Sequence, residues 1–392
     1  MYLITNGRIV LENEILIGYD LAIKGDIIKK IFKKGEFNLN SEYEIIDANG
    51  GYIVPGFIDI HSDYIEHMAA PRPTTLMDFE LSIREAEKQL ISHGITTMFH
   101  SLSLYKSSEF GNNPIRNPEN VCKFIDLIDE SHASKHLIRH RFHARFEIDN
   151  LEQVDNLKNY INDDKVHLVS IMDHTPGQGQ YKNLEIYRET LKGYNNLTDI
   201  EIDEIIENSQ RKDKMTIDMI REIGHLANEK GIAFASHDDD SIEKLDLVQS
   251  FGANISEFPI TLEVAKEAKN RGMFTIAGAP NILLGGSHSG NLSAAAAIQH
   301  DSIDILCSDY YPAALLHSIF KLHEEYGHDL SQMFKLITIN PAKAVNMDDE
   351  IGSIKENKKA DILIIEKIED HYPAITSIFV DGKLTLKTNY RV

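Results

Sequence analysis

Eight short apolar runs that alternate with helix-like stretches constrain the fold of this 392-residue chain more than any other feature. Segments that switch between strand and helix patterns in this way are typical of βαβ units, in which helices cover both faces of a parallel sheet. Eight such units within about 290 residues predict an α/β fold, a (β/α)8 TIM-type barrel. An open doubly wound sheet is the alternative, because spacing alone does not prove closure. The runs are residues 52–60, 95–103, 140–148, 166–174, 232–238, 253–260, 273–280 and 303–309.

Both ends of the chain have a different pattern from the middle. Residues 1–54 and 346–392 alternate short apolar runs with Gly and Asn turns, and Asp381-Gly382 is a strong hairpin signal. These segments predict one small β-sandwich domain assembled from both termini, beside a barrel domain over 55–345. The stretch near 178–227 is too long for a simple crossover and has helical patterns, which predicts a helical insertion over the barrel mouth.

The overall charge excludes several classes of partner. The formal net charge is -21 and no run of Lys or Arg offsets it, so we expect neither nucleic acid nor a membrane as a partner. No segment has the roughly 18 apolar residues that a membrane span needs. Two cysteines, Cys122 and Cys307, are too few for a disulfide framework, and the first residues lack a signal-peptide pattern. We therefore expect a cytoplasmic protein. The sequence does not determine its oligomeric state, and a homo-oligomer is one of the open alternatives.

Six of the eight expected strands end in a histidine or a carboxylate. In a barrel of this type the active site forms at the carboxyl ends of the strands. Side chains two residues apart on a strand share a face, so paired residues at one strand end are expected to converge. The residues, strand by strand, are His61 with Asp63, then His100, then His143 with Arg145 and Glu147, then Asp173 with His174, then His237 with Asp238, Asp239 and Asp240, and finally Asp309.

Imidazole and carboxylate groups together suit a divalent metal ion. Zinc, manganese and iron all accept these ligands in a site that leaves positions open for water and substrate. Each piece alone is weak, since His100 is also explained as a core histidine and the acidic run after His237 as a helix N-terminus. Six strand ends populated in the same way favour a metal-dependent active site with one or two ions.

A glycine-rich run over 278–297 precedes an expected Ala-rich helix. Backbone N–H groups of such a loop and the helix N-terminus favour phosphate oxygens, and a tight turn with left-handed glycines is the alternative. The loop HTPGQGQYKN, residues 174–183, is expected to close over the substrate. Two arginines are candidate anion partners because a guanidinium forks onto phosphate, and surface ion pairing is their alternative. The candidate substrate-binding residues are Arg72, Arg145, Gly285, Gly286, Ser287, His288, Ser289, Gly290 and Asn291.

Longer motifs resemble a known family. PGFIDIHSD, TINPAKAVN and GSIKENKKADILIIE resemble the amidohydrolase superfamily, which implies a metal-bearing barrel joined to a β-sandwich from both termini. HSDYIEHMAAPRP, MDHTPGQGQY, SHDDD, ISEFPITLE, GAPNILLGGSHSGNLSA and SDYYPAALL resemble, more narrowly, the M-component family of the carbon-phosphorus lyase pathway. That resemblance implies a diphosphatase of phosphonate metabolism. Its implied substrate is a polyphosphorylated sugar, alpha-D-ribose 1-methylphosphonate 5-triphosphate, from which it releases pyrophosphate.

The resemblance also implies site residues. His237 and Asp309 would be catalytic, with Asp309 as the general base. Two strands depart from the commonest superfamily pattern, because Asp63 stands where a second histidine is usual and Glu257 ends a strand without a histidine. Glu147 is expected to bridge the ions if two are bound. The implied metal ligands are His61, Asp63, Glu147, His174, His237 and Asp309.

Two other functions remain open on the sequence. The same metal site could serve a deaminase or deacetylase that hydrolyses a carbon–nitrogen bond, although a nucleobase pocket has little use for two glycine-containing loops. A non-catalytic family member is the second alternative, and the six retained candidate ligands argue against it.

Overall fold

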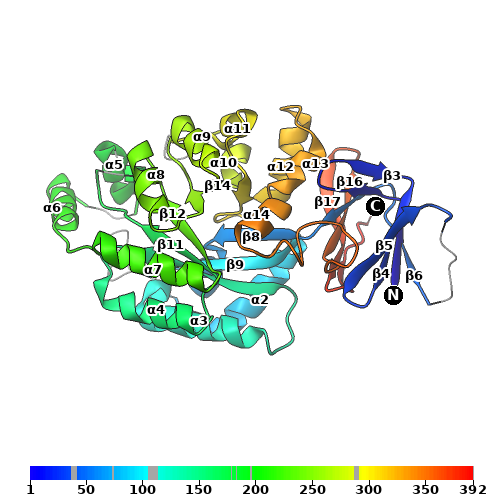
Figure 1. The fold of residues 1–392 in the computed structure, drawn as a ribbon, viewed down its shortest axis with the longest axis horizontal. Helices are drawn as coiled ribbons and strands as arrows, with labels where there is room; N and C mark the ends of the chain where they lie inside the picture. The colour runs from blue at the N-terminus through cyan, green and yellow to red at the C-terminus, as the bar shows by residue number, and fades with distance from the viewer. Residues whose placement is uncertain are drawn as a thin grey trace.

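Eight parallel strands form the centre of the molecule in this computed structural model (Figure 1). Each strand pairs with the next one along the chain, from β8 to β15. The two edge strands also meet, because the Asp63 N–H donates to the Asp309 carbonyl at 2.9 Å and the Asp309 N–H donates to the His61 carbonyl at 3.2 Å. The sheet is therefore a closed (β/α)8 barrel, which confirms the predicted fold and excludes an open sheet.

The barrel strands coincide with the eight apolar runs of the sequence. They are β8 (Phe57–Ser62), β9 (Ile95–Leu104), β10 (Arg139–Glu147), β11 (Leu168–Met172), β12 (Ala233–His237), β13 (Ile255–Glu257), β14 (Phe274–Gly278) and β15 (Ile305–Cys307). The structure describes residues 1–36, 42–72, 75–104, 114–177, 179–181, 183–194, 197–286 and 291–391.

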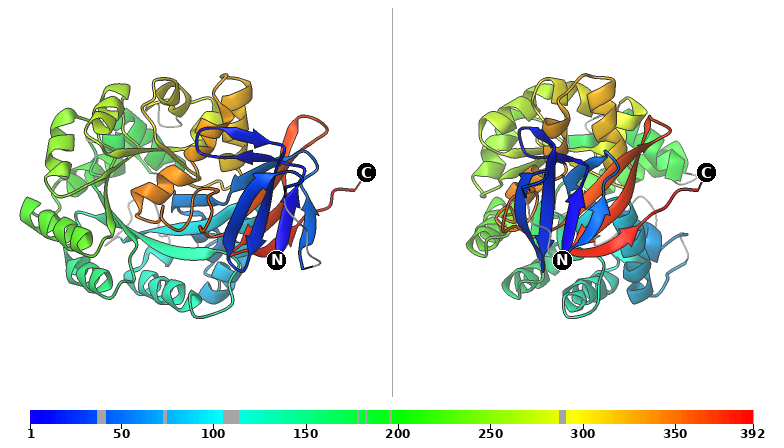
Figure 2. Two further views of the ribbon diagram at one scale, coloured as in Figure 1. Left: turned by 45° about the vertical axis from the view of Figure 1, so that its right-hand side comes forward. Right: turned by 90° about the vertical axis from the view of Figure 1, so that its right-hand side faces the viewer.

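Helices surround the barrel strands on the outside (Figure 2). The first long helix shows why they form there, since its side chains Phe79, Ile83, Ala86 and Leu90 repeat every three to four residues and are all buried. The Asp78 side chain caps this helix by accepting from the N–H of Leu81. The helices are α1 (Tyr64–Ala69), α2 (Phe79–Ser92), α3 (Pro118–Ser131), α4 (Val154–Asn162), α5 (Leu184–Tyr194), α6 (Asp199–Gln210), α7 (Ile217–Glu229), α8 (Ile242–Gln249), α9 (Leu262–Asn270), α10 (Ala279–Leu284), α11 (Ala294–Gln299), α12 (Ala314–Glu324), α13 (Leu330–Lys335) and α14 (Ile339–Ala344).

Strands from both termini lie together at one end of the molecule (Figures 1 and 2). One sheet has the order β5-β4-β1-β6, and a second, β18-β17-β16-β7-β2-β3, joins C-terminal to N-terminal strands. Asp381 and Gly382 make the predicted hairpin turn between β17 and β18, with φ of 47° and 68°. The strands are β1 (Tyr2–Thr5), β2 (Arg8–Val10), β3 (Ile15–Ile17), β4 (Tyr19–Lys24), β5 (Ile27–Lys33), β6 (Glu44–Asp47), β7 (Tyr52–Pro55), β16 (Ile362–Ile368), β17 (Tyr372–Val380) and β18 (Lys383–Lys387).

The stretch near 178–227 contains α5, α6 and most of α7. Helices α5 and α6 lie at the end of the molecule opposite the terminal sheets (Figure 1). They have a small apolar core of their own, formed by Tyr187, Leu191, Ile202 and Ile206. Helix α6 is also tied to the loop after β11, because the Gln210 side-chain amide donates to the Pro176 carbonyl at 3.0 Å.

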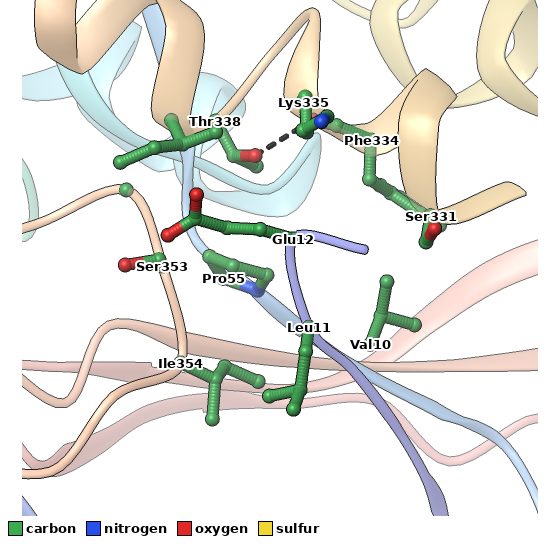
Figure 3. A pocket seen from close by; sticks show the side chains of 12 residues that line it. Val10, Leu11, Glu12, Pro55, Ser331, Phe334, Lys335, Thr338, Ser353 and Ile354 are labelled. Carbon is green, nitrogen blue, oxygen red and sulfur yellow. Dashed lines mark hydrogen bonds between the residues drawn. The ribbon is translucent and has the colours of Figure 1, made fainter. Parts of the chain in front are cut away.

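A small pocket lies where the terminal strands meet the helices that follow the barrel (Figure 3). Its volume is about 10 Å³, which is room for roughly one water molecule. None of the candidate site residues lines it, so it is not the substrate site. Its lining includes Val10, Leu11, Glu12, Pro55, Phe334, Lys335, Thr338, Ser353 and Ile354. Within the described residues, no helix combines the length and the apolar character that crossing a bilayer requires.

Candidate metal centre

A bulge in β8 sets the direction of His61. Asp59 pairs with Met98 and Ser62 with His100, so β8 has one more residue than β9 between these pairs. Such a bulge re-aims the side chains around it, and bulges are common beside active sites. The His61 ring lies 5.1 Å from the ring of His143 on β10 and 5.6 Å from that of His237 on β12. His61 therefore points into the barrel, towards strands that are not its neighbours.

His237 is the centre of two groups of potential metal ligands. His61, His237 and Glu257 offer ligand atoms that all lie within 4.8 Å of one another, and so do His174, His237 and Asp238. The rings of His174 and His237 are 5.7 Å apart. Five side chains from four strand ends thus converge on the inner space of the barrel.

Glu147 and His174 form a hydrogen-bonded pair at the ends of β10 and β11, between Oε1 and Nδ1. Burial raises the pKa of Glu147, but the charge of His174 beside it and their hydrogen bond outweigh burial, so the net shift is downward. Burial likewise lowers the pKa of His174, and Glu147 and then Asp238 reverse this to a net rise. Each of the two residues therefore favours the charged form of the other.

Three residues at the strand ends have a left-handed backbone although they are not glycine. The φ angles are 53° at Asp238, 54° at Phe258 and 59° at Asp309. Such conformations cost about 1–3 kcal/mol each and cluster at functional sites, where the surrounding structure enforces them. At Asp238 the turn brings Oδ2 to 3.0 Å from Nδ1 of His237, its neighbour in the chain.

Asp63 and Asp309 are neighbours at the seam where the barrel closes, because the Asp63 N–H donates to the Asp309 carbonyl. Burial, followed by the charge of Asp63, raises the pKa of Asp309 to about 7, and Arg145 opposes this rise. Gly278 keeps space beside Asp309, since a Cβ there would lie 3.4 Å from Asp309 Oδ2. The centre of the barrel therefore has a carboxylate pair next to the histidine cluster.

The donor set fits a divalent metal ion. Within the described residues, Nε2 of His237 and Oδ1 of Asp63 are buried and make no hydrogen bond. Buried polar atoms normally have a partner, and such atoms beside other histidines and carboxylates are what a metal site requires. The structure brings His61, Glu147, His174 and His237 together, and places Asp63 and Asp309 at the seam beside them.

Sequence reasoning assigned no ligand role to His143, Asp238 or Glu257, yet all three belong to this cluster. Glu257 Oε1 lies 3.0 Å from His61 Nδ1 and 3.6 Å from His143 Nε2. The signal in the sequence was the His143, Arg145, Glu147 alternation, and the unexplained Glu257 at a strand end. In the sequence Asp238 was one of three aspartates after His237, and its left-handed turn is what directs it back to His237.

His100 lies outside the cluster, as its interpretation as a core histidine predicts. Its Nε2 lies 2.8 Å from His140 Nδ1, and the two rings stack. His140 in turn reaches Glu87 on α2, with 3.3 Å between Nε2 and Oε2. The neighbouring Ser101, and not His100, faces the barrel interior, where it contacts His143 Nδ1 at 2.9 Å.

The candidate anion-binding residues occupy different places. The positive charge of Arg145 lowers the pKa values of His61, Glu147 and Asp309, which places this arginine at the cluster. Arg72 is exposed in the segment after α1. Gly285 ends α10 with φ of 78°, so a turn glycine is present, and Gly286 follows it.

The glycine-rich run is anchored beside the strand ends on both sides. Helix α10, in the first part of the run, follows β14 directly. Later in the run the Leu292 N–H donates to the Ile260 carbonyl after β13 at 3.2 Å. Within the run, Ser287, His288, Ser289 and Gly290 lie outside the described residues, and the description of the chain resumes at Asn291.

Comparisons with known sequences identify a family and several relatives. A family model described as the amidohydrolase family matches residues 52–386. The chain is 34% identical over 373 residues to the alpha-D-ribose 1-methylphosphonate 5-triphosphate diphosphatase of Escherichia coli (strain K12), covering 94% of this chain and 96% of that protein. A dihydroorotase of Clostridioides difficile (strain 630) is 37% identical over 127 residues, covering 32% of this chain and 26% of that enzyme.

Solved structures show the same fold at low sequence identity. The N-acetylglucosamine-6-phosphate deacetylase from Pasteurella multocida has a TM-score of 0.62 and 13% identity, over 98% of this chain and 99% of that one. The D-hydantoinase from a Bacillus sp. AR9 has a TM-score of 0.64 and 14% identity, over 99% and 95%. Given the match over residues 52–386 and the closed barrel with its histidine and carboxylate cluster, the chain belongs to the amidohydrolase family.

Proposed function

We propose that this chain is a metal-dependent diphosphatase that releases pyrophosphate from alpha-D-ribose 1-methylphosphonate 5-triphosphate in the cytoplasm. The observation that carries this proposal is the 34% identity to the Escherichia coli enzyme of that name, which extends over 94% of the chain. A match over 373 residues extends far beyond any single motif.

The metal ligands in this proposal are His61, Asp63, Glu147, His174, His237 and Asp309, with zinc as the proposed ion and manganese or iron as alternatives. A divalent ion held by these residues would activate water and offset the charge of phosphate groups. Water adds across the anhydride between the α and β phosphates, so that pyrophosphate leaves and the sugar keeps its 5-phosphate. The Asp309 carboxylate accepts the proton that the water loses.

Holding a triphosphate in a protein of net charge -21 requires local positive groups. Arg145 supplies one at the cluster itself, where its charge acts on His61 and Asp309. The N–H groups of the glycine-rich run, anchored next to β13 and β14, are the proposed cradle for the leaving pyrophosphate. Bound divalent ions would supply further positive charge.

Phosphorus NMR of the purified, zinc-loaded protein with the ribose phosphonate triphosphate tests the proposal. The expected result is loss of the three triphosphate signals and appearance of pyrophosphate and a 5-phosphate monoester. Release of orthophosphate alone would show cleavage of another bond. No change with this substrate, together with turnover of dihydroorotate or an N-acetylated sugar phosphate, would favour the carbon–nitrogen hydrolase alternative.

A further inference from the structure

A buried set of polar side chains lies inside the barrel next to His61. Ser101, His143, Ser170 and Glu257 are each 0% exposed, and they come from β9, β10, β11 and β13. A carboxylate in such a place is strongly unfavourable unless hydrogen bonds compensate for the lost water. The partners of Glu257 therefore decide what it does.

The side chains form one continuous hydrogen-bonded chain. The Ser62 N–H donates to Ser101 Oγ at 2.9 Å, and Ser101 Oγ lies 2.9 Å from His143 Nδ1. His143 Nε2 lies 2.5 Å from Ser170 Oγ, which donates to Glu257 Oε2 at 2.7 Å. The chain of bonds closes on the residue before Ser62, since Glu257 Oε1 lies 3.0 Å from His61 Nδ1.

The carboxylate end of this chain and a neutral His143 together fix the direction of every bond in it. A backbone N–H only donates and a carboxylate only accepts. Ser170 gives its hydrogen to Glu257, so its oxygen accepts from His143 Nε2. A neutral His143 then accepts at Nδ1 from the Ser101 hydroxyl, whose oxygen in turn accepts from the Ser62 N–H. Each hydroxyl and ring nitrogen in the chain thus has one defined role.

Both carboxylate oxygens of Glu257 are used by this arrangement. Oε2 accepts from Ser170, and Oε1 accepts from His61 Nδ1, which therefore carries the hydrogen. The imidazole of His61 is then left with Nε2 as its only unprotonated nitrogen, the form that binds a metal ion.

We propose that Glu257 is a positioning residue, which holds His61 as the Nδ1-protonated tautomer and directs Nε2 at the metal ion, while the bonds from Ser62 to Ser170 hold Glu257 in turn. A carboxylate behind a ligating histidine fixes the ring and raises its basicity, and removing such a partner costs about 10–100-fold in metal affinity. The proposal rests on His61 being a metal ligand, but not on which substrate the enzyme cleaves.

Zinc affinity, measured by competition with a chelator at neutral pH, tests this role. Glu257→Gln keeps the size of the side chain and removes its charge. We expect it to weaken zinc binding by about 10–100-fold without changing the number of ions bound at saturation. Ser170→Ala, which leaves the Glu257 side chain in place, should weaken binding in the same direction but less. Glu263→Gln, an exposed carboxylate on α9, is the matched control and should bind zinc as the wild type does.

A double mutant separates positioning from a general loss of structure. If Glu257 acts through His61, adding Glu257→Gln to His61→Ala should cause no further loss of zinc affinity. Wild-type affinity in both Glu257→Gln and Ser170→Ala would overturn the proposal, and so would the loss of one ion at saturation in Glu257→Gln, which would make Glu257 a ligand. Full zinc retention in His61→Ala would instead contradict the metal site on which the proposed function depends.

Discussion

The imidazole of His237 and the carboxylate of Asp238 are neighbours in the chain and yet face each other, with 3.0 Å between Nδ1 and Oδ2. Successive residues of a strand normally point to opposite faces. Here Asp238 leaves the strand with φ of 53°, which turns its side chain back to His237. This single turn brings Asp238 to His174 and His237, and the resulting group shares His237 with the group of His61 and Glu257.

His237→Ala should therefore remove more metal than any other single change in the cluster. We expect the metal content of the purified variant to fall at least about tenfold, because both groups lose a donor, while the barrel stays folded. Elemental analysis and circular dichroism measure the two effects. His371→Ala, an exposed histidine in the turn between β16 and β17, is the control. Full metal content in His237→Ala would remove His237 from the ligand set.

Asp309→Asn should slow turnover of the triphosphate substrate by about 10²-fold or more, the scale of a lost general base, with most of the metal still bound. Asparagine tolerates the left-handed backbone at this position, so folding should be preserved. Asp370→Asn changes an exposed residue with φ of 63° and is a matched control for that backbone. Steady-state kinetics at neutral pH measure the turnover of both variants. A rate near that of the wild type in Asp309→Asn would exclude Asp309 from the reaction.

Gly286→Val tests the proposed pyrophosphate cradle. A Cβ at Gly286 would meet no atom within 4 Å, and its φ is outside the left-handed region, so we expect little loss of stability. Inhibition by added pyrophosphate should nevertheless weaken, because bulk beside the N–H groups hinders the anion, while metal content stays unchanged.

Gly285→Val is the contrasting variant, since Gly285 has φ of 78° and a side chain there is strained. Its melting temperature should fall, whereas that of Gly286→Val should not. Unchanged pyrophosphate inhibition in folded Gly286→Val would show that the run is a turn and not a cradle.

His167 should make the fold less stable in acid. Burial first, and then the charges of Arg141 and His132, lower its pKa from 6.5 to about 3. Below pH 6.5, His167 therefore binds a proton in the unfolded chain, whereas in the folded chain it binds one only at about pH 3. Its contribution to the free energy of unfolding is complete above pH 6.5 and decreases as the pH falls, by about 1.4 kcal/mol per pH unit.

His167→Gln removes this titration, so its free energy of unfolding should change less steeply between pH 6.5 and 5 than that of the wild type. Urea unfolding at several pH values measures both slopes. Equal slopes would show that His167 accepts its proton in the folded state as easily as in the unfolded chain.

The sequence by itself determined the order of strands and helices and which strand ends have histidines and carboxylates. Apolar runs separated by amphipathic stretches specify a covered parallel sheet. Its closure into a barrel was established only by the contacts between Asp309 and residues 61–63. The residues His61, Glu147, His174 and His237 were also recognisable, because each stands directly at the end of a run.

Only the tertiary structure decided which of two neighbouring residues faces the barrel interior. Strand β9 is buried on both faces, so the sequence did not distinguish His100, which faces outward, from Ser101, which faces the cluster. A bulge directs His61, and a left-handed turn directs Asp238, and neither depends on residue type alone. The pairing of His61 with Glu257 joins residues 196 positions apart, and it exists because barrel closure brings β8 and β13 around one interior.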